Sequence, residues 1–173
     1  MQREGITNVG VCNQAAGGNA MLSGGLGPTL ASRYRRDAIE QPGVGWVMVF
    51  EGVNDLGNAA DGSATQLADR ITALYKTIIS ESKAKGYKTI GATITPFNGQ
   101  GQSYSGQGRE QARLKINNWI MTSGEFDLAV DFSKSIGNGQ QLMAAYDGGD
   151  HLHPNVAGYT KIAADFPLDI FKT

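Results

Sequence analysis

Short apolar runs alternate along the chain with longer segments in which apolar residues recur every three or four positions. The short runs predict four strands: Asn8–Asn13, Trp46–Glu51, Thr89–Thr95 and Leu128–Phe132. The second run is continuous enough to be buried on both faces, as central parallel strands are. The alternation of strands and helices is typical of a mainly parallel sheet covered by helices, so we expect an α/β fold.

Four of the longer segments have the spacing and the end signals of helices. The clearest follows Ser63, whose side chain is expected to accept from a free backbone N–H in a capping box with Gln66. An apolar stripe then faces the sheet, and Gly86 ends the helix. The stripe consists of Leu67, Ile71, Leu74 and Ile78. The other predicted helices run from about Pro28 to Gln41, from about Arg109 to Thr122, and from near Pro154 with Tyr159, Ile162 and Ala163 buried.

The composition limits the class of protein. A chain of 173 residues with 40% hydrophobic content and a net charge of −1 is expected to form one domain over residues 1–173, with no bias toward nucleic acid. No run approaches the length of a membrane span, and residues 1–5 hold no apolar signal core. The lone Cys12 excludes an internal disulfide and is expected to be buried in a strand. No cluster of His and Cys suggests a metal, and no cofactor is expected.

The segment before the last helix holds the most specific chemistry. In Asp150-His151-Leu152-His153-Pro154, a carboxylate stands three residues before an imidazole in what is expected to be a turn. Such a pair can act as the orienting acid and the general base of a hydrolase. Alternatively, Asp150 caps the helix and His153 is a surface histidine. His151 is the competing base.

Two other polar positions follow apolar runs. Asn54, in Gly52-Val53-Asn54-Asp55, can donate its side-chain amide to a developing oxyanion, although Asn-Asp sequences often form Asx turns. Gly18, which precedes Asn19, lets its backbone N–H approach a ligand, although it can equally serve a flexible turn. Residues 98–108 are rich in Gly, Ser and Gln and predict a loop at the carboxyl end of the third strand, where open α/β sheets bind ligands.

Taken in order, these three motifs resemble three of the four blocks of the SGNH (GDSL-type) esterase and acylhydrolase family, especially its secreted fungal and actinobacterial members. The resemblance implies a three-layer, flavodoxin-like, mainly parallel sheet and hydrolysis of short acyl or acetyl esters, some of them carbohydrate-linked. It assigns Gly18 and Asn54 to the oxyanion hole, and Asp150 and His153 to the triad acid and base.

The fourth block of that family, a Gly-Asp-Ser sequence that carries the nucleophile on the first strand, occurs nowhere in the chain. We therefore expect an SGNH-like domain that is truncated at its amino terminus, lacks the first strand and has no nucleophile. Three serines could be considered as substitutes, but none stands in a Gly-x-Ser-x-Gly elbow. They are Ser23, Ser103 and Ser105.

Three functions remain open. The chain is a weak or inactive form of a serine esterase, a hydrolase that uses another nucleophile or a water activated by His153, or a binding domain on a hydrolase scaffold. The expected partner is a small or carbohydrate ester. Loss of the central strand would leave a slot between the strands at Asn8 and Trp46, closed either by direct pairing of those strands or by a homodimer, which we favour. Localisation stays open, with secretion suggested by the resemblance alone.

Overall fold

Three parallel strands form the centre of the protein in the order β1-β2-β3. They are β1 (Trp46–Val49), β2 (Lys88–Ala92) and β3 (Leu128–Val130). This computed structural model describes Met1 and residues 4–172; Gln2 and Arg3, part of the polar start, and Thr173 lie outside the described residues. Val47 pairs with Thr89 and Ile90 with Leu128, which confirms three of the predicted strands and their parallel arrangement.

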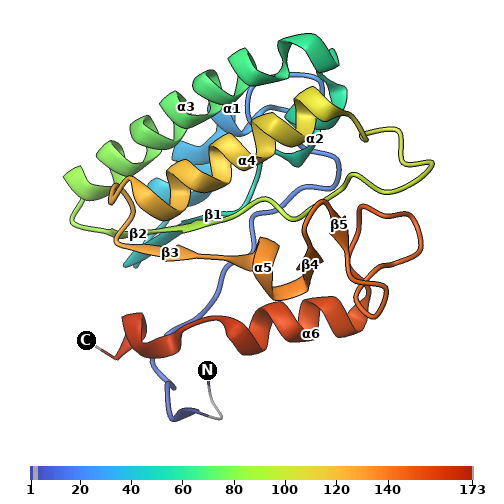
Figure 1. Cartoon of the computed structure of the whole chain (residues 1–173). Coiled ribbons are helices and arrows are strands. Elements are labelled where there is room, and N and C mark those ends of the chain that lie inside the picture. The colour runs from blue at the N-terminus through green and yellow to red at the C-terminus, as the bar shows by residue number, and fades with distance from the viewer. Residues whose placement is uncertain (2–3, 173) are drawn as a thin grey trace.

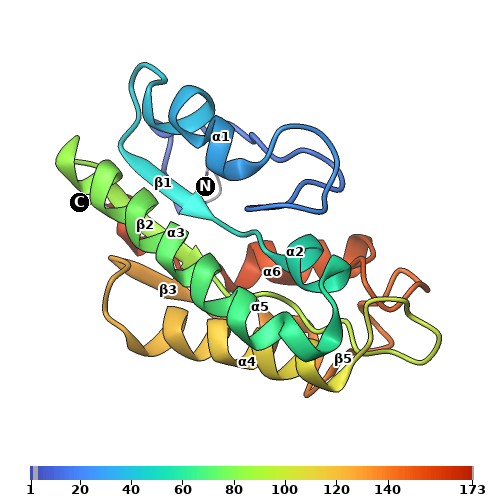
Figure 2. The ribbon, with the colours of Figure 1, turned by 90° about the horizontal axis from the view of Figure 1, so that it is seen from above.

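Helices cover both faces of this sheet, as Figures 1 and 2 show. On one face lie α3 (Ala64–Ala84) and α4 (Gln107–Thr122), with α1 (Leu30–Tyr34) and its π-helical continuation Arg35–Ile39 beside β1. On the other face lie α5 (Phe132–Ile136) and α6 (Val156–Asp165). The expected three-layer α/β architecture is therefore confirmed. A short helix α2 (Val53–Asn58) and a hairpin of β4 (Gly137–Asn138) and β5 (Gln141–Leu142) were not predicted.

Each face of the sheet has its own apolar core. Ile71 and Ile78 of α3 are fully buried, as the predicted stripe required, and Ile116 of α4 is fully buried with them. Burying one such side chain stabilises the fold by about 1.5–3 kcal/mol. Below the sheet, Ile90 of β2 packs with Ile162 of α6. These two cores fix the carboxyl ends of the strands, from which the loops of the candidate site emerge.

The ends of two helices differ from the prediction. Ser63 does not accept a capping bond; its Oγ donates to the backbone oxygen of Ala60, because the chain enters α3 through a 3₁₀ turn, Asp61–Ser63. In α6, Tyr159 and Ala163 are exposed, since the buried side of this helix runs through Gly158 and Ile162 instead.

Residues 8–13 do not form the predicted strand, and Cys12 is exposed. A strand needs a neighbour to receive its backbone hydrogen bonds, and in the described part of the chain no strand pairs with this segment. Its direct pairing with β1, one of the two ways expected to close the slot, is thus not observed. Val11, the residue before Cys12, is also exposed.

The outer edge of β1 consequently has no partner strand among the described residues. Val47 and Val49 are buried, but Met48 and Phe50, on the opposite face, are exposed. The prediction that this strand is buried on both faces was therefore wrong, because a continuous apolar run does not reveal whether a neighbour covers its second face.

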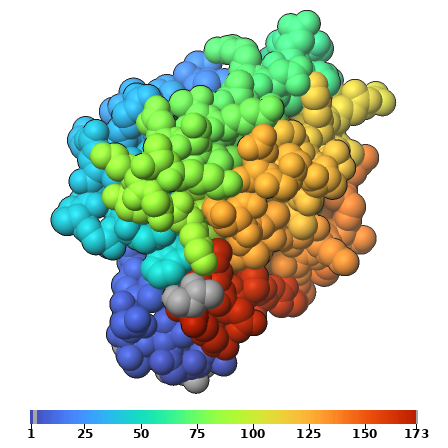
Figure 3. Space-filling model, turned by 90° about the vertical axis from the view of Figure 1, so that its left-hand side faces the viewer, coloured from blue at the N-terminus to red at the C-terminus, as the bar shows by residue number. Residues whose placement is uncertain are grey.

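The two ends of the described chain lie side by side below the sheet (Figures 1 and 3). The short 3₁₀ helix Leu168–Phe171 follows α6 there, and the ring of Phe171 meets Trp46 of β1 edge to face at 5.1 Å. Among residues 1 and 4–172, no helix combines the length and apolar character needed to cross a membrane.

Candidate active site

The acid–base turn, residues 147–155, leads into α6. The carboxylate of Asp150 accepts the Leu152 N–H at 3.0 Å and the His153 N–H at 2.8 Å through one oxygen. Its other oxygen lies 2.6 Å from Nδ1 of His153. The predicted contact between this Asp and His is therefore present. Asp150 does not cap α6, because Asn155 holds that position and accepts from the Gly158 N–H at 2.9 Å.

These hydrogen bonds also set the charge of the pair. The His153 backbone N–H and then its imidazole hold the pKa of Asp150 down at about 2, so the carboxylate is ionised across the physiological range. An ionised carboxylate only accepts hydrogen bonds, so Nδ1 of His153 carries the proton. In the neutral imidazole, Nε2 then has the lone pair that a general base requires. The His153 side chain is 69% exposed, so a substrate can reach it.

A second carboxylate–imidazole pair lies in the same turn. Nδ1 of His151 is 2.5 Å from the carboxylate of Asp147, whose side chain is only 10% exposed. The competing base named from the sequence therefore has an acid of its own, and it does not replace His153 on Asp150. Asp147 was not predicted from the sequence, although its spacing of four residues from His151 was available as a signal.

Asn54 lies in the first turn of α2, directly beyond the carboxyl end of β1. Its side-chain nitrogen donates to the backbone oxygen of Asn19 at 2.7 Å, and its side-chain oxygen accepts from the hydroxyl of Tyr104 at 3.0 Å. The amide nitrogen carries two hydrogens, so one remains available to a ligand. Asn54 is thus a helical residue with a fixed amide orientation, and not the centre of an Asx turn.

Gly18 immediately precedes Asn19 and has a left-handed backbone, with φ of 71°. Its carbonyl accepts the Leu26 N–H at 2.7 Å, whereas its own N–H has no partner within the described residues. A side chain at this position would meet Leu26 at 2.8 Å. The backbone conformation therefore favours glycine, and the free N–H lies one residue from the carbonyl that Asn54 contacts.

Hydrogen bonds connect this pair of oxyanion candidates to the acid–base turn. Tyr104 holds Asn54, and the backbone N–H of Tyr104 donates to the side-chain oxygen of Gln102 at 3.1 Å. The amide nitrogen of Gln102 donates in turn to the backbone oxygen of Asp150 at 2.6 Å. Residues 98–106 form a loop, whereas residues 107 and 108 of the predicted loop belong to α4, and the loop joins the two halves of the candidate site (Figure 1). Gln102 and Tyr104 were not predicted individually.

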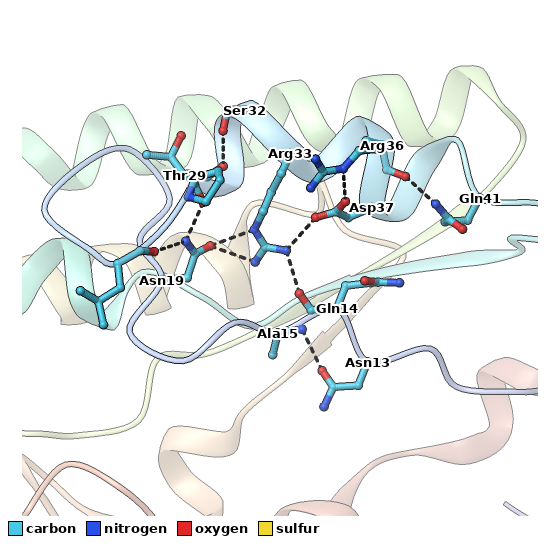
Figure 4. Close-up of polar contacts among 12 residues, drawn as sticks. Asn13, Gln14, Ala15, Asn19, Thr29, Ser32, Arg33, Arg36, Asp37 and Gln41 are labelled. Atoms are coloured by element: carbon cyan, nitrogen blue, oxygen red, sulfur yellow. Dashed lines mark hydrogen bonds and ion pairs between the residues drawn. The ribbon is translucent and has the colours of Figure 1, made fainter.

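The Arg33 side chain reaches from α1 to Asn19, the residue after Gly18, as Figure 4 shows. This buried guanidinium donates twice to the side-chain oxygen of Asn19, at 3.0 and 2.9 Å, and once to the backbone oxygen of Gln14 at 2.7 Å. It also pairs with Asp37 at 3.1 Å. The amide nitrogen of Asn19 then closes the loop by donating to the carbonyls of Leu26 and Pro28.

Two carboxyl groups, the buried Asp55 and the partly buried Glu51, lie near Asn54 in the sequence. Asp55 accepts the backbone N–H groups of Met21 at 2.6 Å and Leu22 at 2.8 Å, and burial raises its pKa. Burial, followed by repulsion from Asp55, raises the pKa of Glu51 to about 7. One side-chain oxygen of Glu51 is buried without a partner. Asp55 thus anchors the loop after Asn19 to the first turn of α2.

A cleft of about 260 Å³ opens beside α2. Its lining is mostly polar and includes the side chains of Ser23, Asn58, Ser63, Gln66 and Arg70. Asn58 lies one helical turn after Asn54 and donates to its backbone oxygen at 2.8 Å. The cleft therefore begins one turn of helix away from the oxyanion candidates.

None of the three candidate serines contacts His153 in the described chain. Ser105 Oγ donates to the carbonyl of Gly99 at 2.7 Å, Ser103 Oγ donates to Gln102, and Ser23 lines the cleft. Within the described ranges, His, Cys, Asp and Glu side chains form no group of three or more that could hold a metal ion.

The sequence matches the GDSL-like Lipase/Acylhydrolase family over residues 1–161, and the chain belongs to that family. A search of curated proteins found no match.

Solved structures share the fold at low sequence identity. A proposed acylhydrolase from Bacteroides fragilis aligns with a TM-score of 0.67 and 23% identity, over 82% of this chain and 67% of its own. A GDSL-like lipase from Bacteroides thetaiotaomicron aligns with a TM-score of 0.61 and 18% identity, over 82% of this chain and 68% of its own. A variant of an acetyl xylan esterase from Geobacillus stearothermophilus aligns with a TM-score of 0.59 and 23% identity, over 82% of this chain and 66% of its own. The chain thus spans about two thirds of the length of these proteins.

Proposed function

We propose that this chain supplies the acid–base and oxyanion groups of an esterase that acts on short acyl or acetyl esters. The observation that carries the proposal is the 2.6 Å contact of Asp150 with His153, joined through Gln102 and Tyr104 to Asn54. Ester hydrolysis needs a base beside the nucleophile, a group that orients the base, and donors for the oxyanion. Each of these roles except that of the nucleophile has a candidate here.

The proposed chemistry follows from the free atoms of the site. Nε2 of His153 takes the proton of the attacking hydroxyl, while Asp150 stabilises the imidazolium that forms. As the ester carbonyl becomes tetrahedral, its oxygen gains negative charge. The second amide hydrogen of Asn54 and the N–H of Gly18 donate to that oxygen. His153 then returns the proton to the departing alcohol, which leaves the acyl group on the attacking oxygen. Water attacks that acyl ester with His153 again as the base, which releases the acid and restores the hydroxyl.

The attacking serine is the part that the sequence does not provide. No Gly-Asp-Ser block is present, and no described serine contacts His153. We therefore propose that the chain as given hydrolyses esters weakly or not at all, and that full activity requires a Gly-Asp-Ser strand beside β1. Loss of the nucleophile from a triad removes most of the rate, leaving only what binding and the oxyanion groups supply.

A carbohydrate-linked ester is the proposed substrate class. One neighbour in structure is named as an acetyl xylan esterase, and the cleft beside α2 presents hydroxyl, amide and guanidinium groups. Such groups bind the hydroxyls of a sugar, whereas a long acyl chain needs an apolar wall. The alcohol portion of the ester would extend from Asn54 toward Asn58 and Gln66.

Hydrolysis of p-nitrophenyl acetate tests the proposal in three forms of the protein. These are the chain as given, its His153→Ala variant, and a version that carries an amino-terminal Gly-Asp-Ser block. The proposal expects activity to appear only in the third form. Activity of the chain as given that is lost in His153→Ala indicates a different nucleophile. If even the third form is inactive but binds sugar esters, the scaffold is a binding domain.

A homodimer through the open edge of β1 is proposed as well. This edge has no partner strand in the described chain, and Met48 and Phe50 are exposed beside it. Pairing two such edges would satisfy backbone groups and cover the apolar side chains. Light scattering should show twice the 18.3 kDa mass of the chain, and the Met48→Lys variant should have the mass of a single chain. Leu114→Lys, an exposed position on α4, is the control; a wild-type monomer at micromolar concentration contradicts the dimer.

A further inference from the structure

The Asp147 carboxylate makes more hydrogen bonds around His151 than a simple surface ion pair would. One carboxylate oxygen of Asp147 accepts the backbone N–H groups of Gly149 at 2.8 Å and His151 at 3.0 Å. The other oxygen lies 2.5 Å from Nδ1 of His151. Burial works to raise the pKa of Asp147, but these three hydrogen bonds outweigh it and lower the pKa. The ionised carboxylate thus fixes both the backbone and the side chain of His151.

The backbone of His151 explains why such fixing is needed. His151 has φ of 60°, the only non-glycine residue with positive φ in the described chain. This conformation costs of order 1 kcal/mol or more for a residue with a side chain. This left-handed residue lies between Asp150 and the two residues whose backbone N–H groups donate to the Asp150 carboxylate, Leu152 and His153. The left-handed residue therefore returns the chain toward Asp150.

Neighbouring segments hold the same turn from both sides. The side chain of His151 packs directly over Gly99, where an added Cβ would lie 2.2 Å from it. The backbone N–H of Gly148 donates to the His153 carbonyl at 2.8 Å, and Asp147 forms a β-bridge with Pro154. Asp147 thus lies at the base of the turn, and His151 lies at its bend.

We propose that Asp147 and His151 form a positioning pair, which fixes the turn so that Asp150 can hold His153 in the orientation of a general base. The inference rests on the proposed function, because it concerns the same acid–base pair. It gives His151 a role other than that of the competing base: the imidazole acts through the backbone of the turn and does not take the proton of the nucleophile.

Proton NMR of the chain tests the inference without any need for ester hydrolysis. A proton shared between an imidazole Nδ1 and a carboxylate resonates at low field, and its exchange with water reports how well the bond is held. Isotope labelling assigns the signals of His151 and His153, together with one variant that lacks the His151 imidazole and one that lacks the His153 imidazole. The variants that decide the matter are His151→Ala, His151→Asn and His151→Gly.

The inference expects the Nδ1–H signal of His153 to exchange at least about tenfold faster in His151→Ala, the equivalent of one lost hydrogen bond. Asn tolerates left-handed backbone and can donate to Asp147, so His151→Asn should restore slow exchange. His151→Gly relieves the strained backbone and should fold, but it lacks the donor, so its His153 signal should also exchange fast. Asp165→Asn, which breaks the i,i+4 contact with Lys161 on α6, is the matched control and should match wild type.

The positioning role is overturned if the Nδ1–H proton of His153 exchanges slowly and keeps its wild-type chemical shift in His151→Gly or in a folded His151→Ala. Fast exchange in His151→Asn equal to that in His151→Ala also overturns it. A wild-type protein without any low-field His153 signal is a separate outcome: it means that the Asp150–His153 bond itself is absent, and the proposed function fails along with the inference.

Discussion

The side-chain amide of Asn54 donates to the backbone oxygen of Asn19 at 2.7 Å, across 35 positions of sequence. This bond joins the first turn of α2 to the residue that follows Gly18. Two donors that the sequence suggested for an oxyanion are therefore held as one unit. Because Tyr104 fixes the other end of the same amide, the second N–H of Asn54 has a defined direction.

Replacement of Asn54 by Ala should lower kcat by about 10²- to 10³-fold in the version that carries the Gly-Asp-Ser block, with a smaller change in KM. The physical reason is that the donor acts on charge that develops only in the transition state. Asn118→Ala, an exposed amide on α4, is the control and should leave kcat within about twofold. Steady-state kinetics on p-nitrophenyl acetate give both constants; an unchanged kcat in Asn54→Ala would remove Asn54 from the oxyanion hole.

Replacement of Arg33 by Met should destabilise the chain by about 2–4 kcal/mol, because the side-chain oxygen of Asn19 and the carbonyl of Gln14 lose a buried charged donor. Arg36→Met is the matched control, since the Arg36 side chain is 73% exposed and shares the Asp37 partner. It should change the free energy of unfolding by about 0.5 kcal/mol or less. Urea denaturation measures both variants, and equal effects would contradict a specific role for Arg33.

Glu51 should make the chain less stable as the pH rises. Burial raises its pKa from 4.5 to about 7 in the folded chain, so between these values the folded state binds more protons than the unfolded state. The free energy of unfolding then falls as the pH rises through that window, by up to about 1–3 kcal/mol. The raised pKa of Asp55 acts with the same sign.

Glu51→Gln should reduce this loss, so that the variant is more stable than wild type at pH 8 and similar to it at pH 4. Urea titrations at both pH values provide the measurement. A wild-type protein that gains stability between pH 5 and 8 by an amount that Glu51→Gln abolishes would show that the carboxylate is favoured in the fold, contrary to its burial.

The parts of the fold that the sequence predicted are those with strong local periodicity. The stripe through Ile71 and Ile78 on α3 is buried, and the runs at Trp46, Thr89 and Leu128 each contain a strand, because a buried face imposes its period on the sequence. The segment 8–13 has a similar apolar run but no strand to pair with, and pairing is a long-range property that a local pattern does not contain.

The candidate site divides in the same way. Asp150 and His153 are three residues apart, so a local motif was enough to predict their contact, which is present. Gln102 and Tyr104 reach Asp150 and Asn54 across about 50 positions of sequence, and nothing in their neighbourhood marks them. Asp147 lies between these cases: its partner is close in sequence, but its importance follows from the left-handed backbone of His151, which only the structure reveals.

The most direct test of the acid–base assignment is kcat/KM for p-nitrophenyl acetate in the version with the Gly-Asp-Ser block, compared among wild type, His153→Ala and Asp165→Asn. Removal of a triad base should lower kcat/KM by about 10³-fold or more, whereas Asp165→Asn should stay within about twofold of wild type. That result is the one the account predicts. A His153→Ala variant that is properly folded and retains wild-type kcat/KM would contradict it.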